Sequence, residues 1–305
     1  MSNLLRAMMG ASGVSSGWFG TGSSYGYVSG GGGGETNRID KHSFPNETTS
    51  TDVGNLSAGR SGQSGTSSTV SGYSAAGGGS VIDKFSFSSD GDASFVGNTY
   101  ASRSDGENAG FQSESYGYSS GGFSGGYLSS CDKYAFASDG DATFVGDFVG
   151  GTRNGPTGAG SDTHGYVFGG ESGGSIDIIE KFDLSSDGDS VDVGNMDLHR
   201  DGISATSTAT YGHTAGGYTG APTVNQLNIE KSTWASDGNA SDIADLTGTR
   251  RALVGTSEES YGYAMGGYTS SASDMIERYS NSSDLNSSDI ANLSDARYSP
   301  AGQQI

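Results

Sequence analysis

Cysteine, histidine and long apolar runs are scarce in this chain of 305 residues. Its single cysteine, Cys131, excludes an internal disulfide framework, and the Cys and His residues show no zinc-like spacing. No apolar run approaches the roughly 18 residues of a membrane span. The N-terminal stretch MSNLLRAMMGASG has one basic residue and too short an apolar run for a secretory signal. A disulfide-rich or membrane-spanning protein is therefore not expected.

Basic residues are also few. The chain has 15 Lys and Arg against 35 Asp and Glu, which gives a formal net charge of −20. Such a chain repels the phosphates of nucleic acids and of anionic membranes. We therefore expect no nucleic-acid partner and no general attraction to membrane surfaces.

Hydrophobic residues make up only 32% of the chain, a fraction low enough to raise the possibility of disorder. The 16 Tyr and 12 Phe argue against it, because they recur at fixed positions. Together with 54 glycines, this composition favours many short strands joined by tight turns. The expected core consists of small residues and aromatic rings.

A motif of the form Tyr-Gly-Tyr-x-x-Gly-Gly recurs six times in more or less degenerate copies. Its second-position glycines are spaced by 45–50 residues and are Gly26, Gly72, Gly117, Gly165, Gly212 and Gly262. Each copy is followed by an apolar-acidic-basic phrase such as IDKFSF at 82–87, then by a turn and a short strand such as FVGN at 95–98. Each unit closes with an arginine, and these are Arg60, Arg103, Arg153, Arg200, Arg250 and Arg297.

Four strands in each 45–50-residue unit are typical of a β-propeller blade. The sequence predicts an all-β, six-bladed propeller over residues 23–305, with repeats that start near residues 23, 69, 114, 162, 209 and 259. A β-solenoid is the main alternative, although solenoids usually have shorter repeats. Residues 1–22 lie outside the repeats.

The arginine-containing loop and the strand that ends in Gly-Gly resemble the kelch repeat. The usual tryptophan of the fourth strand is absent, so the pattern is a divergent, kelch-like one. The terminal segment SPAGQQI aligns with the start of an innermost strand, which predicts that it closes blade one beside Tyr25–Gly31. Gly17-Trp18-Phe19-Gly20 is the competing segment. Closure across the termini would remove an exposed sheet edge.

The phrase Ser-Asp-Gly-Asp has two interpretations. Its carboxylates could bind calcium weakly, and the candidate ligands are Asp90, Asp92, Asp139, Asp141, Asp187 and Asp189. A hairpin turn between the third and fourth strands is favoured, because Asp caps such turns and Gly adopts positive φ there. No bidentate acid follows at the spacing of a calcium loop, so we expect neither a metal nor another cofactor.

Twelve of the 15 lysines and arginines recur at two positions of every blade, so we expect them to be framework residues that pair with the Asp of neighbouring turns. Arg6, Arg38 and Arg251 lie outside this framework. No acid pair, catalytic triad or phosphate loop stands out, which predicts a protein without enzymatic activity. The departures from the repeat lie in the loops after Gly-Gly, which carry the aromatic residues Phe123, Tyr127, Tyr218 and Tyr268. Aromatic residues on variable loops over a rigid scaffold favour recognition, with capping of the ring as the alternative.

The phrases IDKF, SDGDA and YGY–GG resemble the low-complexity, kelch-like repeats that tailed phages of cyanobacteria encode. That resemblance implies a virion component in the tail or on the capsid surface, present in several copies or as a homo-oligomer. Residues 1–22 carry Leu4, Leu5, Met8, Met9, Trp18 and Phe19, an apolar arm suited to anchoring on another virion protein. An arm folded back on its own propeller is the alternative.

The expected function is therefore attachment, with the variable loops binding a host-surface receptor or glycan. The alternative is a carbohydrate-active enzyme with its site in the central channel.

Overall fold

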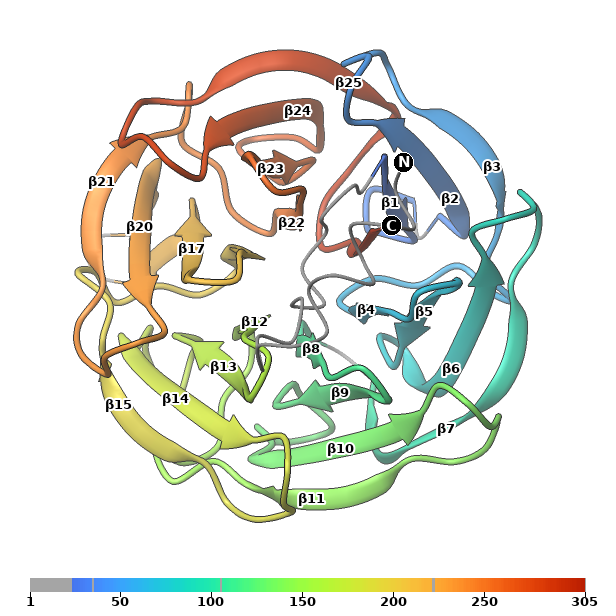
Figure 1. Ribbon diagram of the computed structural model, residues 1–305, viewed down its shortest axis with the longest axis horizontal. Helices are drawn as coiled ribbons and strands as arrows, with labels where there is room; N and C mark the ends of the chain where they lie inside the picture. Colours follow the sequence, from blue (N-terminus) through green and yellow to red (C-terminus); the bar gives the residue numbers. More distant parts are fainter. Residues whose placement is uncertain (1–23, 35, 105, 221–222, 305) are drawn as a thin grey trace, which may run out of the picture.

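The computed structural model, which describes residues 24–34, 36–104, 106–220 and 223–304, contains six four-stranded antiparallel sheets. Each sheet combines the last strand of one repeat with the main strands of the next repeat, and the first sheet takes its inner strand from the last repeat. Six such sheets stand around a central axis like the blades of a propeller (Figure 1). The predicted six-bladed β-propeller is confirmed.

The four strands of a blade run from the axis outward in chain order, except in blade one. The inner strands are β26 (Ala301–Gln304), β4 (Ser64–Ser67), β8 (Ala109–Gln112), β12 (Thr157–Gly160), β16 (Ser204–Ser207) and β22 (Val254–Ser257). The second strands are β1 (Tyr25–Ser29), β5 (Ser71–Ala75), β9 (Tyr116–Ser120), β13 (His164–Phe168), β17 (Tyr211–Ala215) and β23 (Tyr261–Met265).

The two outer layers follow the same order. The third strands are β2 (Arg38–Ser43), β6 (Gly79–Ser86), β10 (Ser130–Ala135), β14 (Ile178–Asp183), β20 (Asn228–Thr233) and β24 (Ser273–Ser280). The fourth strands are β3 (Thr51–Asn55), β7 (Ser94–Arg103), β11 (Thr143–Asp147), β15 (Val191–Asn195), β21 (Ser241–Asp245) and β25 (Ser288–Arg297). A small hairpin, β18 (Tyr218–Gly220) with β19 (Thr223–Asn225), is inserted in blade five.

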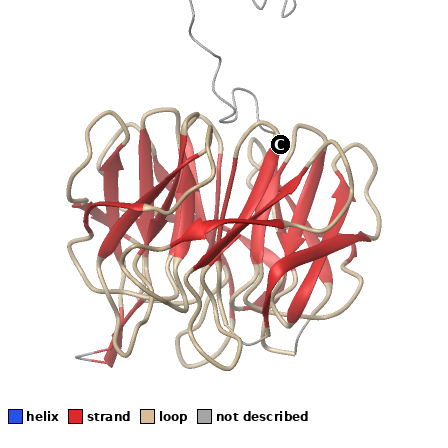
Figure 2. Cartoon of the chain, turned by 90° about the horizontal axis from the view of Figure 1, so that it is seen from below, coloured by secondary structure: helices blue, strands red, loops and turns tan. Residues whose placement is uncertain are grey.

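The connecting segments gather on two opposite faces of the disc (Figure 2). Because consecutive strands are antiparallel, the loops after Gly-Gly share one face with the connections that follow the blade-ending arginines. We call this the loop face. The Ser-Asp-Gly-Asp turns lie on the opposite face, which we call the turn face.

The ring is closed by the C-terminal strand, as predicted. β26 pairs with β1 in the register Ser29↔Ala301 to Gly26↔Gln304. The buried side chain of Gln303 donates to the carbonyl of Tyr73 at 2.9 Å, so the closing strand is also tied to blade two. Gly17-Trp18-Phe19-Gly20, the competing segment, lies outside the described residues.

Aromatic rings fill the seams between blades. Tyr166 of blade four stacks on Trp234 of blade five with ring centroids 4.2 Å apart, and Tyr73 stacks on Phe136 of blade three at 4.8 Å. Cys131 is fully buried in the same layer and packs as a small hydrophobe. The predicted core of small residues and rings is confirmed.

The inner strands approach one another too closely for larger side chains. They carry small residues at the narrowest level, namely Gly65, Gly110, Gly158, Ala205, Gly255 and Gly302. A Cβ on Gly65 would lie 2.2 Å from the carbonyl oxygen of Gly302, and one on Gly158 would lie 2.3 Å from that of Gly110. Backbone therefore constricts the central channel.

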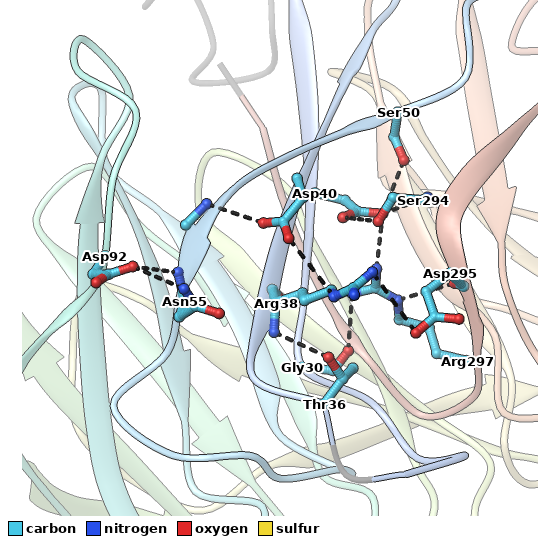
Figure 3. A network of polar contacts seen from close by, with 12 residues as sticks. Gly30, Thr36, Arg38, Asp40, Ser50, Asn55, Asp92, Ser294, Asp295 and Arg297 are labelled. Carbon is cyan, nitrogen blue, oxygen red and sulfur yellow. Dashed lines mark hydrogen bonds and ion pairs between the residues drawn. The ribbon is translucent and has the colours of Figure 1, made fainter.

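A buried ion pair crosses every seam, because each blade-ending arginine reaches the acid of the next blade's third strand. The pairs are Arg60–Asp83, Arg103–Asp132, Arg153–Glu180, Arg200–Glu230, Arg250–Glu277 and Arg297–Asp40. A register shift just before the acid recurs in every blade, between Ile39 and Asp40 for example. At the last seam, Asp40 also accepts hydrogen bonds from Ser50 and Ser294 (Figure 3).

The expectation that these arginines pair with turn aspartates is therefore wrong. They are buried and need a buried anion, because an unpaired charge in the interior is very costly. The acid of the apolar-acidic-basic phrase supplies that anion from inside the sheet.

The turn aspartates do pair with the third-strand lysines. Lys41 contacts Asp90 of blade two at 3.1 Å, and Lys84 contacts Asp139 of blade three at 3.1 Å. The second acid caps the preceding blade, since Asp92 accepts from both the backbone and the side-chain nitrogen of Asn55 (Figure 3). Asp141 does the same for Asn98, and Asp189 accepts from the backbone of Asp147. The Ser-Asp-Gly-Asp turns therefore join neighbouring blades through ion pairs and hydrogen bonds.

Candidate functional site

A bowl of about 490 Å³ opens on the loop face at the propeller axis. Two equivalent positions from each blade form it. The floor consists of Gly62, Glu107, Gly155, Gly202, Ala252 and Ser299, and the wall consists of Ser61, Gly106, Asn154, Asp201, Arg251 and Tyr298, with Tyr268 beside them. The volume lies within the range of small-molecule sites.

Backbone hydrogen bonds run around the floor. Ser299 N–H donates to the carbonyl of Ala252 at 2.7 Å, Ala252 to Gly202 at 2.6 Å and Gly202 to Gly155 at 3.0 Å. Gly155 donates to Glu107 at 3.1 Å, and Gly62 donates to Ser299 at 2.8 Å. This chain of hydrogen bonds makes the floor rigid.

Five of the six floor residues have left-handed backbone, with φ between 48° and 74°, namely Gly62, Gly155, Gly202, Ala252 and Ser299. Glu107 is the exception. In blade three the hydrogen bond to the carbonyl of Gly62 comes from the next residue, Asn108, at 3.2 Å. The repeat is thus broken at the one floor position that carries a carboxylate.

The Glu107 carboxylate is half-buried, and the hydroxyl of Ser299 donates to it. Burial raises the pKa of Glu107 to about 6, with the Ser299 hydrogen bond and the charge of Arg251 acting in the opposite direction. A Cβ on Gly202 would lie 3.4 Å from its Oε2 atom, so the carboxylate lies close to the floor of the neighbouring blades.

The wall adds a second acid. Asp201 accepts a hydrogen bond from the hydroxyl of Ser175 at 2.7 Å. Burial raises the pKa of this carboxyl, and the nearby charge of Glu171 adds to the effect. Both acids of the bowl are therefore easier to protonate than a carboxyl in water.

Aromatic rings surround Arg251. Its guanidinium carbon lies 4.6 Å from the ring centroid of Tyr218 and 5.5 Å from that of Tyr268. Tyr268 in turn meets Tyr298 edge-on, with centroids 5.4 Å apart. The bowl thus combines two carboxyls, one guanidinium and a tyrosine cluster.

The structure brings the four predicted recognition residues to the loop face as two pairs. Tyr218 and Tyr268 meet at Arg251, and each is joined by backbone hydrogen bonds to a wall residue, Asp201 and Arg251 respectively. Phe123 and Tyr127 contact each other, with centroids 5.7 Å apart. A Cβ on Gly106 would lie 3.1 Å from that of Phe123, which places this pair near the wall in blade three.

Other predicted residues do not contribute to the bowl. The arm residues Leu4, Leu5, Met8, Met9, Trp18 and Phe19 lie outside the described residues. Within the described ranges, no three His, Cys, Asp or Glu side chains gather as a metal site requires. The calcium candidates lie on the turn face, where the structure gives Asp90 and Asp92 protein partners. No helix in the described part of the chain is long and apolar enough to cross a membrane.

Sequence reasoning missed Glu107, Asp201 and Tyr298 and counted Arg251 only as a residue outside the framework. A signal was present in the repeat itself. The six inner strands can be aligned on the small residues that narrow the channel, from Gly65 to Gly302. The floor residue then stands three positions before each small residue, and in chain order it is Gly, Glu, Gly, Gly, Ala and Ser. The lone charged residue in that series is Glu107.

No protein-family model matches this chain, and a search of curated proteins finds no match. The function must therefore be inferred from the geometry of the bowl.

The raised pKa of Glu107 predicts a stability cost at neutral pH. Its pKa is about 6 when folded against an ordinary value of 4.5, so ionisation disfavours the folded state as the pH rises through this interval. We expect Glu107→Gln to melt a few degrees above the wild type at pH 7.5 and level with it at pH 4. Glu114→Gln, at an exposed position, is the control for thermal unfolding at both pH values. A lower melting temperature for Glu107→Gln at pH 7.5 would contradict this prediction.

Proposed function

We propose that this protein is a non-enzymatic recognition module that binds a saccharide in the bowl of the loop face. The observation that carries the proposal is the break in symmetry at this point. The six blades repeat one framework of ion pairs and aromatic seams, whereas the wall residues Asn154, Asp201, Arg251 and Tyr298 differ chemically from blade to blade. A scaffold that needs no such variety for its own stability indicates a ligand site.

Saccharides suit this combination of groups. Carboxylates such as Glu107 and Asp201 accept hydrogen bonds from sugar hydroxyls, and tyrosine side chains offer apolar ring surface with a polar tip. The bowl presents both kinds of group on a floor made rigid by backbone hydrogen bonds. A preorganised floor lowers the ordering cost of binding.

One observation favours binding over catalysis in the channel. The two cavities along the axis beyond the floor hold about 80 and 70 Å³, too little for a sugar ring with its hydroxyls. This weighs against the alternative of a carbohydrate-active enzyme with a site in the channel.

The phage resemblance completes the proposal. On the resemblance of the repeat phrases to those of tailed phages, we propose that the module is a virion component present in several copies, with residues 1–22 as its anchor and the loop face turned toward the host surface. The measurement for this part is the protein content of purified particles. Absence of the chain from purified virions would reject it without affecting the saccharide site.

Glycan-array binding tests the site itself. We expect Glu107→Gln and Asp201→Asn each to weaken binding about 10- to 100-fold, because each removes a charged hydrogen-bond acceptor. Glu114→Gln, in the turn between β8 and β9 on the turn face, should bind like the wild type. Absence of binding to any glycan would reject the proposed function, and turnover of a sugar would replace it with the enzymatic alternative.

A further inference from the structure

Arg251 stands apart from the other basic residues. Every other Lys and Arg in the described part of the chain forms an ion pair, including the partly exposed Arg38 with Asp52 and Asp295. Among the described residues, no carboxylate lies within 4 Å of the Arg251 guanidinium, and no acceptor receives a hydrogen bond from it. The bowl therefore contains a cation that has no carboxylate partner among the described residues.

Acids are not lacking nearby. The chain has 35 Asp and Glu, and both Glu107 and Asp201 are close enough to feel the charge of Arg251. The guanidinium is instead directed by the rings of Tyr218 and Tyr268. A cation–π contact of this kind holds a guanidinium over a ring without using its N–H donors on an acceptor atom, so these donors remain available to a ligand.

We infer that the ligand of the bowl is an acidic saccharide whose carboxylate or sulfate group binds Arg251. This inference rests on the proposed function and adds the charge of the ligand to it. Planar guanidinium donors match an oxyanion through two parallel hydrogen bonds. The hydroxyls of the same sugar would then reach the acceptors Glu107 and Asp201 on neighbouring parts of the bowl.

The net charge of −20 restricts how an acidic ligand can be bound. The field of the whole protein repels an anion, but salt screens it beyond about 8 Å at physiological ionic strength. An acidic sugar is therefore held by contacts inside the bowl rather than by long-range attraction. Arg251 is the group in the bowl that can supply an attractive charge at contact distance.

A glycan array with neutral, uronate-bearing and sulfated saccharides tests the inference with the full-length protein. Signals confined to one or both acidic classes support the inference. Comparing uronate-bearing with sulfated saccharides shows whether the bowl binds a carboxylate or a sulfate group. Signals on neutral glycans that equal or exceed those on acidic ones overturn the inference and leave the proposed function intact. Silence of the whole array overturns both.

Variants at Arg251 provide the second test, by titration calorimetry with the strongest acidic glycan. Arg251→Gln should weaken binding at least tenfold and abolish the preference over the neutral counterpart, because a charged hydrogen-bond donor is lost. Arg251→Lys should restore part of the affinity. Arg38→Gln, which alters an arginine already paired with aspartates, is the matched control. Unchanged affinity in a folded Arg251→Gln protein would overturn the inference.

Discussion

Replacing Asp132 with alanine is expected to lower the free energy of unfolding by about 3–5 kcal/mol, the usual result of removing one partner from a buried ion pair. Asp132 and Arg103 are both fully buried, and their charges meet at 2.7 Å across the seam between blades two and three. The substitution leaves the guanidinium without its counter-charge in the interior. For a chain of this length, the melting temperature should fall by roughly 10 °C.

Arg103 cannot leave its position to find water. It also donates to the backbone carbonyls of Gly121 at 2.7 Å, Ala101 at 2.9 Å and Ser119 at 3.1 Å. These bonds fix the guanidinium at the end of blade two, so the charge stays buried when Asp132 is removed. We therefore expect no relaxation that recovers the lost free energy.

The matched control is Asp139→Ala, which removes a turn aspartate from the exposed pair with Lys84. Exposed pairs contribute about 0–1 kcal/mol, so this variant should unfold close to the wild type. Thermal unfolding followed by circular dichroism compares the two. Equal effects of Asp132→Ala and Asp139→Ala would show that burial does not set the strength of the seam.

Deleting residues 301–305 is expected to prevent formation of the closed propeller. The deletion removes β26 and exposes the inner edge of β1 along Gly26–Ser29. It also removes the buried hydrogen bonds of Gln303 to Ser29 and Tyr73. The backbone N–H and C=O groups along the inner edge of β1 then have no partner strand. Such an edge can pair with another chain, so the truncated protein should aggregate. Size-exclusion chromatography and circular dichroism provide the measurement.

A synthetic peptide of residues 297–305 should restore a monodisperse propeller when it is added during refolding, because strand addition can satisfy the open edge. Gln303→Ala in the full chain separates the contribution of the backbone pairing between β26 and β1 from that of the Gln303 side-chain hydrogen bonds. It keeps β26 and loses only the side-chain hydrogen bonds, so it should fold with lower stability. A truncated chain that elutes and melts like the wild type would refute the closure of the ring by β26.

The repeat allowed the blades, the strand order and the closing strand to be predicted, because each depends on local patterns that recur six times. The pairing of the blade-ending arginines was predicted wrongly. The abundance of aspartate in neighbouring turns favoured the turn aspartates as partners, whereas burial of both Arg103 and Asp132 decides the pairing. Burial depends on how blades stack, and periodicity along one chain does not report it.

The bowl was largely hidden for the opposite reason. Glu107, Asp201 and Arg251 each appear in one blade only, because the equivalent positions of the other blades carry different residues. Within a regular repeat they therefore looked like chance deviations. Their meeting depends on ring closure, which brings residues 62, 107, 155, 202, 252 and 299 around one axis. The aromatic loop residues Tyr218 and Tyr268 were predicted because they occupy equivalent positions after Gly-Gly. Their shared partner Arg251 could not be assigned without the fold.

The closing strand has a consequence for the order of events during synthesis. β1 is among the first parts of the propeller that the ribosome makes, whereas its inner partner Ala301–Gln304 comes some 270 residues later. Contacts so distant in sequence form slowly, because the chain between them must first be ordered. Five blades can therefore assemble while blade one still lacks its inner strand. During this interval the nascent protein presents an open sheet edge, and the floor of the bowl, which includes Ser299, is not yet complete. The proposed ligand is therefore expected to bind only after Ser299 has been synthesised and has joined the floor of the bowl.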